Sequence, residues 1–91
     1  MAYSREEAVE AARKDLAARL GVSESEVGEG SVESADFPDA ALGAPTAGEM
    51  SGMMITPGWR IRLRAAGKTY EYRANPNQLR LFKFKGKNYK I

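Results

Sequence analysis

Three carboxylates, Asp36, Asp39 and Glu49, lie in or beside a stretch of the chain that is rich in proline and methionine. Three oxygen ligands could hold a hard cation, and two carboxylates could divide acid and base roles. Their spacing does not match a calcium-binding loop. The Pro38-Asp39 pair is typical of a turn in which the aspartate accepts hydrogen bonds from nearby backbone amides. We therefore predict a structural role for Asp39 and similar bracing by Asp36, with metal binding or catalysis as the alternative.

The 91-residue chain contains neither histidine nor cysteine. The lack of histidine excludes Ser-His-Asp and Cys-His catalysis and removes the commonest general base and metal ligand. The lack of cysteine excludes a disulfide framework and a thiolate metal site, and it is compatible with a reducing compartment. We therefore predict that the protein is not an enzyme, has no catalytic residues and uses neither a metal nor another cofactor.

The length of 91 residues leaves room for one hydrophobic core, so residues 1–91 are predicted to form a single domain. Hydrophobic residues make up 43% and charged residues 29%, as in ordinary folded proteins. No segment has the apolar core of a signal peptide, and none approaches the roughly 20 apolar residues that span a bilayer. We expect a cytoplasmic, monomeric protein that makes no contact with a membrane.

Residues 37–60 contain three of the four prolines and three of the four methionines and show neither helical nor strand periodicity. Loops of such length in compact domains tend to be functional or disordered. Its apolar content predicts that this loop folds onto the domain. Exposed methionines would suit a partner peptide because their flexible side chains repack against varied surfaces, whereas buried ones would fill gaps beside the sheet edge. The predicted partner-binding residues are Asp39, Leu42, Met50, Met53, Met54 and Trp59. Trp59 is also a candidate core residue, since it begins the apolar face of a strand.

Charge is divided unevenly along the chain. Residues 1–55 carry four basic and eleven acidic side chains, a net charge of −7, whereas residues 56–91 carry ten and one, a net charge of +9. Such asymmetry can indicate an anionic partner for the basic half. We favour a second explanation, in which an acidic helix lies beside a basic sheet and the two halves neutralise each other, because both halves must share one core in so short a chain.

Cations and aromatic rings alternate in the basic half in a way that suggests a second candidate site. Cations for phosphates beside aromatic faces for bases are what a single-stranded nucleic acid surface requires. A solvated sheet face and lysines that protect an edge strand explain the same pattern without a ligand. The candidate nucleic-acid-binding residues are Arg60, Arg62, Arg64, Lys83, Lys85 and Lys87.

The local signals predict one helix followed by strands. Ser4 and Glu7 form a capping box, apolar residues follow at spacings of three to four, and Gly21 supplies the left-handed position that ends a helix. A helix is therefore predicted over residues 4–20, with at most one further turn near residues 23–26. Strands are predicted over residues 31–37, 59–65, 69–74 and 79–84, the clearest being the period-two alternation of 59–65. The expected fold is α+β: one helix packed on a three- to four-stranded antiparallel sheet, with a long ordered loop between the first and second strands.

Two resemblances follow from the order of residues. The segments F-P-D-x-x-L-G, P-G-W-R-I and G-K-x-Y-E-Y resemble those of a group of small bacterial proteins, several of them cyanobacterial, over residues 31–74. That group has no assigned activity, and its cysteines correspond to Ala41 and Ser51, which implies that no thiol role is essential here. The order of S-R-E-E-A-V-E-A-A, a strand and G-K-x-Y-E-Y is loosely similar to PepSY-like domains. That similarity implies an interaction role or the inhibition of a peptidase.

These observations favour a non-catalytic protein-binding module, with peptidase inhibition as one form of that role, in which a helix–sheet scaffold presents residues 42–54 to an unidentified protein partner. The alternative is a single-stranded nucleic-acid-binding domain that uses the basic sheet face and the C-terminal segment.

Overall fold

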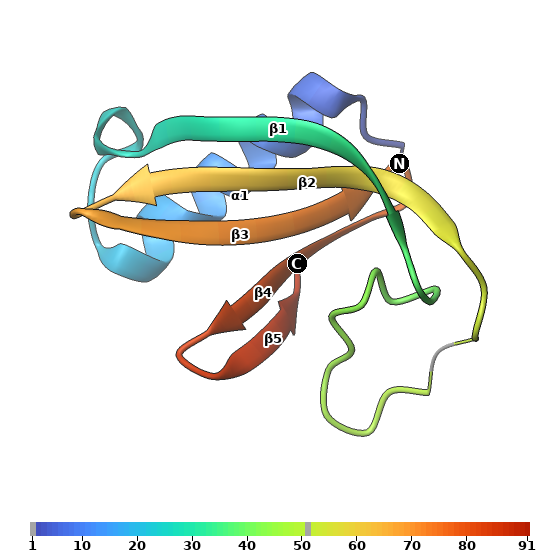
Figure 1. Cartoon of the computed structure of the whole chain (residues 1–91). Helices are drawn as coiled ribbons and strands as arrows, with labels where there is room; N and C mark the ends of the chain where they lie inside the picture. The colour runs from blue at the N-terminus through green and yellow to red at the C-terminus, as the bar shows by residue number, and fades with distance from the viewer. Residues whose placement is uncertain (1, 51) are drawn as a thin grey trace.

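The computed structural model describes residues 2–50 and 52–91. One helix and a short 3₁₀ turn precede a meander of antiparallel strands with the spatial order β1-β2-β3-β4-β5 (Figure 1). The predicted α+β fold is confirmed, but the sheet has five strands rather than three to four. The elements are α1 (Arg5–Leu20), η1 (Glu24–Glu26), β1 (Gly28–Phe37), β2 (Thr56–Ala65), β3 (Lys68–Asn75), β4 (Gln78–Phe84) and β5 (Lys87–Lys90).

Helix α1 begins and ends where its local sequence requires. The Ser4 hydroxyl accepts from the Glu7 amide at 3.1 Å, and the Glu7 carboxylate accepts from the Ser4 amide at 2.8 Å. Gly21 ends the helix with a left-handed backbone, φ 69°, which residues with a side chain rarely adopt. The capping box, the helix and its glycine stop are therefore confirmed.

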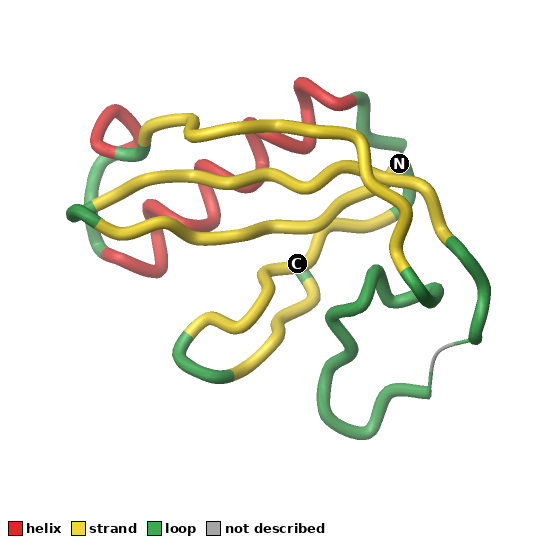
Figure 2. Tube along the Cα trace, in the orientation of Figure 1, coloured by secondary structure: helices red, strands yellow, loops and turns green. Residues whose placement is uncertain are grey.

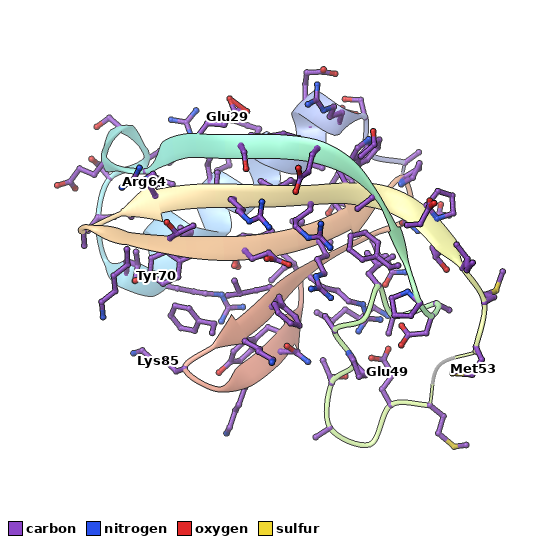
Figure 3. All side chains as sticks on the ribbon, in the orientation of Figure 1. Glu29, Glu49, Met53, Arg64, Tyr70 and Lys85 are labelled. Carbon is purple, nitrogen blue, oxygen red and sulfur yellow. The ribbon has the colours of Figure 1, made fainter. Side chains whose placement is uncertain are left out.

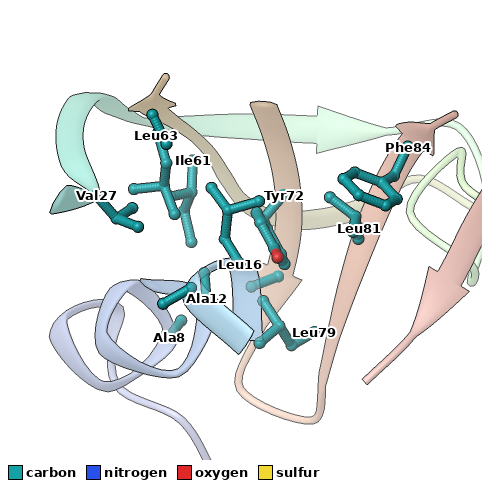
Figure 4. Packing of buried hydrophobic residues seen from close by; sticks show 13 residues of the cluster. Ala8, Ala12, Leu16, Val27, Ile61, Leu63, Tyr72, Leu79, Leu81 and Phe84 are labelled. Carbon is teal, nitrogen blue, oxygen red and sulfur yellow. The ribbon is translucent and has the colours of Figure 1, made fainter. Parts of the chain in front are cut away.

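The main core lies between α1 and one face of the sheet (Figure 4). Alternate residues of β2 point toward the helix, so Ile61 and Leu63 are buried while the arginines between them lie on the opposite face. Tyr72 lies opposite Ile61 on β3 and is fully buried, and burial raises the pKa of Tyr72 well above its ordinary value. Its hydroxyl therefore stays protonated and donates to the Asp15 carboxylate at 2.7 Å. The buried members of this core are Ala8, Ala12, Leu16, Ala17, Val27, Ile61, Leu63, Ala65, Tyr72, Ala74, Leu79, Leu81 and Phe84.

The first two strands are longer than predicted. β1 begins at Gly28 rather than at residue 31, across a bulge between Glu29 and Ser31. β2 begins at Thr56 rather than at residue 59, although it includes Pro57. Pro57 lies opposite Asp36 of β1, but the β2–β3 ladder ends at residue 59. On the β3 side, therefore, no strand residue lies opposite Pro57 that would need its missing N–H. The intervening loop therefore spans residues 38–55.

The C-terminal segment is a hairpin rather than a last strand with a tail. The β4–β5 register shifts between Leu81 and Phe84, where Lys83 has a φ of 49°. This irregularity turns Phe84 toward the helix side, whereas Phe82 pairs with Glu71 on the opposite face. A regular strand would place Phe82 and Phe84 on the same face, but the bulge inserts one extra residue and places them on opposite faces.

Candidate functional site

A second buried group lies on the open face, which is the face of the sheet opposite α1. Phe37, Ala41, Leu42 and Ala44 are buried but are separate from the core beneath the helix. The last three belong to the loop base, residues 38–49, which folds back beside the ends of the strands (Figure 2). The loop base therefore has an apolar anchor of its own. The prediction that the loop folds onto the domain holds for residues 38–49, whereas the apolar side chains of residues 50 and 53–55 are exposed.

The strongest polar tie between the loop base and the sheet is a bidentate ion pair. Two guanidinium nitrogens of Arg80, on β4, donate to the two carboxylate oxygens of Glu49 at 2.5 and 2.7 Å. Arg80 is only 3% exposed and also donates to the backbone carbonyl of Ala44 at 3.3 Å. A planar guanidinium matches a carboxylate in this geometry better than an ammonium does. The pair therefore fixes the loop base in direction as well as in position.

Further donors from β3, β4 and β5 bind carbonyl groups of the loop base. Arg73 donates to the carbonyl oxygens of Leu42 and Gly43 at 3.0 and 3.2 Å. The side-chain amide of Gln78 donates to Ala40 at 2.7 Å, and that of Asn88 donates to Pro45 at 2.9 Å. Three strands thus supply hydrogen bonds to a segment that has no regular structure, which satisfies its partly buried carbonyl groups.

Two of the predicted partner-binding residues, Asp39 and Leu42, make contacts within the loop and with the sheet. One carboxylate oxygen of Asp39 accepts from the amides of Ala41 and Gly43, both at 2.9 Å, in the turn that the Pro38-Asp39 pair predicted. Leu42 is fully buried. These residues shape and anchor the loop and offer a partner little surface.

The methionines lie at the opposite extreme of exposure. Met50, Met53, Met54 and Ile55 are 97, 90, 61 and 72% exposed, and we refer to these four residues as the methionine strip. In Figure 3, Met53 lies on the limb of the loop that leads to β2, whereas Glu49 lies on the limb nearer the β4–β5 hairpin, where it binds Arg80. The exposure of the strip argues against the alternative in which these methionines fill gaps beside the sheet edge.

The arginines proposed for nucleic acid binding are partly neutralised. Arg60 and Arg62 share the carboxylates of Glu33 and Glu71 in four ion pairs of 3.0 to 3.8 Å. The remaining predicted residues of that set, Arg64, Lys83, Lys85 and Lys87, are exposed.

The aromatic rings of the same region already have cationic neighbours. The guanidinium of Arg73 lies 3.7 Å from the ring centroid of Phe82, and that of Arg19 lies 4.3 Å from the ring centroid of Tyr89. Phe84 is buried in the main core. Ring faces that are covered in this way are not free to stack on bases.

Trp59 occupies a different place from the methionine strip. It is half-buried against the main core and lines a shallow hollow of about 450 Å³. The other lining residues are Ser34, Ala35, Asp36, Pro57, Gly58 and Pro76. Asp36 therefore lies beside Trp59, and it does not join Asp39 or Glu49 in a common site.

The three carboxylates from which a metal site was considered do not converge. Asp39 is engaged in its turn and Glu49 in the pair with Arg80. Over residues 2–50 and 52–91, no group of three or more acidic side chains is placed to hold a metal ion.

The one helix in this part of the chain is not long and apolar enough to cross a membrane.

The Arg80–Glu49 pair predicts a pH dependence of stability. Hydrogen bonds from the Arg80 side chain and then from the Thr46 amide lower the pKa of Glu49 from 4.5 to about 2. Because the pKa is depressed in the folded state, this contribution is complete above pH 4.5 and is lost as the pH falls through about 2. Urea unfolding between pH 5 and pH 2 should show a steeper loss of stability for the wild type than for Glu49→Gln. Parallel curves for the two proteins would contradict the assignment.

Sequence reasoning named the carboxylate of the central ion pair but missed its partner. Successive side chains of β3 and β4 alternate between the two faces of the sheet. Ala74, Leu79 and Leu81 face the helix, so their chain neighbours Arg73 and Arg80 face the open side. That alternation could have placed both arginines on the side of the sheet where the loop must fold.

Comparison with known proteins gives one match. The family described as Domain of unknown function (DUF8738) matches residues 9–82, which include most of α1, the whole of β1, β2 and β3, the loop between β1 and β2, and most of β4. No curated protein and no solved structure matches the chain.

Proposed function

We propose that this chain, which belongs to that family, is a non-catalytic protein-binding module that presents the methionine strip to a partner. The observation that carries the proposal is the contrast between the two parts of one loop. Residues 38–49 are bound to the sheet, whereas the four apolar side chains of the strip are at least 61% exposed. Apolar side chains gathered on a surface mark interaction sites more often than scattered ones do.

The energetics support the same conclusion. Burial of a methionine side chain against a partner contributes about 1.5 to 3 kcal/mol, so the strip could supply the apolar centre of an interface. A loop that is already held at its base loses less conformational entropy on binding than a free segment of the same length. The unbranched methionine side chains can also repack to fit the partner.

Peptidase inhibition is the more specific form of this proposal. A loop that is anchored at its base and exposed at its outer limb has the general form of a segment that enters a cleft on another protein. Inhibition assays against serine, cysteine, aspartic and metallopeptidases test this form directly. If none is inhibited, the partner is of another kind and the broader proposal is tested separately.

The double substitution Met53→Ser and Met54→Ser is expected to abolish partner capture and leave the fold intact, because both side chains lie outside the two buried groups. Capture from an extract of the source organism, quantified by mass spectrometry, should show proteins that the wild type enriches and the variant loses by about tenfold or more. Circular dichroism checks the fold.

A matched control removes two exposed side chains elsewhere. Lys83→Ser with Lys85→Ser changes the β4–β5 hairpin and should leave the captured proteins unchanged. If the methionine variant captures the same proteins as the wild type, the proposed role of the strip is wrong.

Nucleic acid binding remains the alternative that this pair of variants distinguishes. It would depend mainly on the exposed lysines of the hairpin, since Arg60 and Arg62 are paired with carboxylates. Binding of a single-stranded oligonucleotide that weakens steeply with salt and is lost in the lysine variant would favour it. An apolar contact through the strip should respond little to salt.

A further inference from the structure

We propose that the outer edge of β1, together with the Trp59 hollow, binds an extended peptide segment that carries a cationic side chain. This surface is distinct from the methionine strip, and the inference does not depend on the function proposed above. Three features carry it: a sheet edge with open backbone groups, two hollows along that edge, and an excess of negative charge beside them.

The outer side of β1 is open to backbone pairing at Ser34 and Asp36, whereas the outward carbonyl of Val32 is already bound by Arg5. β1 is the first strand of the sheet, and within residues 2–50 and 52–91 it pairs with β2 alone. The Val32 carbonyl accepts from the Arg5 guanidinium at 2.6 Å, so it points away from β2. Because backbone groups alternate in direction along an antiparallel strand, Ser34 and Asp36 also direct an N–H and a C=O outward. An extended peptide can add to such an edge as a further strand.

The two hollows are lined by successive residues on one face of β1. Val32, Ser34 and Asp36 face the helix side, since they pair with Ile61, Trp59 and Pro57. Val32 lines a hollow of about 240 Å³ beside the start of α1, and Ser34 and Asp36 line the Trp59 hollow. Residues two apart in a strand are separated by roughly 6.5 Å, so one added strand would present successive same-side residues to both hollows.

The charges beside β1 favour a cationic peptide. Asp36 and Trp59 line the same hollow, so a lysine or arginine side chain there could meet a carboxylate and an aromatic ring together. Glu6 and Glu29 line the other hollow, with Arg5 as the one basic residue among its lining residues. The two edges of the sheet differ in the same sense: β5 carries Lys87 and Lys90, whereas β1 contains no basic residue. Lysines discourage strand addition, so the protected edge is that of β5.

The test is a titration of the protein with the blocked peptide acetyl-Thr-Lys-Thr-Lys-Thr-amide. Binding is monitored by the fluorescence of Trp59, the only tryptophan of the chain, and by the chemical shifts of the backbone amides. We expect saturable binding with shifts that concentrate in β1. Asp36→Asn should weaken binding about fivefold, as expected for the loss of one partly exposed charge pair. The matched control Glu24→Gln removes one exposed carboxylate from η1, outside both hollows, and should bind as the wild type does.

Two further measurements separate strand addition from simple charge attraction. Ser34→Pro removes one outward N–H from the edge and should therefore abolish saturable binding. The variant should still fold, because proline is tolerated in an edge strand where the missing donor faces solvent. If that variant does not fold, the same peptide with N-methylated backbone replaces it and should fail to bind the wild type. Equal binding of the peptide with glutamate in place of lysine, undiminished binding of the N-methylated peptide, or the absence of any shift in β1 would overturn the proposal.

Discussion

Arg80→Ala should lower the free energy of unfolding by about 3 kcal/mol and release the loop base from the sheet. The substitution removes both hydrogen bonds to the Glu49 carboxylate and the one to the Ala44 carbonyl. It leaves a partly buried carboxylate without its counter-charge, and the cost of breaking such a pair from one side exceeds the net value of the intact pair. Domains of this size are stable by about 5 to 15 kcal/mol, so urea unfolding should resolve the loss easily.

The conservative variant Arg80→Lys is the control for geometry. It keeps the charge but cannot bind the two carboxylate oxygens in parallel, so its stability should lie between those of the wild type and Arg80→Ala. The alanine variant should also lose partner capture through the methionine strip, although it leaves all four side chains of the strip in place. If Arg80→Ala is as stable as the wild type, the pair does not hold the loop.

Phe37→Ala should have the largest effect on stability outside the main core, a loss of about 3 to 5 kcal/mol. Phe37 is the largest side chain in the second buried group, which lies on the open face of the sheet. The guanidinium groups of Arg73 and Arg60 lie 5.3 and 5.7 Å from its ring centroid, so truncation would also remove their aromatic neighbour. Chemical unfolding measures the loss, and amide shifts in residues 38–49 show whether it falls on the loop.

A matched truncation on the same face separates burial from contact with arginine. Phe82 is half-buried, and the guanidinium of Arg73 lies 3.7 Å from its ring centroid. Phe82→Ala should therefore cost clearly less than Phe37→Ala, because less apolar surface is returned to water. Equal losses would mean that Phe37 does not anchor the loop through burial.

The helix and the central strands could be predicted because their signals are local. A capping box, a glycine stop and a period-two alternation each act over a few residues, and α1 and β2 follow them. The strand ends were less predictable. Whether Pro57 can lie in a strand depends on where β3 stops, and that is a property of the assembled sheet.

The contacts that hold the loop could not be predicted for the same physical reason. Arg80 reads in the sequence as one charge of a basic, half-exposed strand, and its partner Glu49 is 31 residues away. Burial of an arginine depends on a non-local pairing that no nearby residue announces. The exposure of the methionines was likewise open, since the same residues could have filled gaps or faced solvent. In the folded chain, Phe37 and Leu42 take the buried positions, and hydrogen bonds from Arg73 and Arg80 hold the loop base beside them.

We expect the loop base to be held in one shape against the open face, so that it presents the methionine strip on a fixed support. Backbone ¹⁵N relaxation measures this directly. If the loop base is fixed, the order parameters of residues 38–49 should be close to those of the strands, about 0.85. Values below about 0.6 throughout that segment would show a freely moving loop and would contradict this expectation.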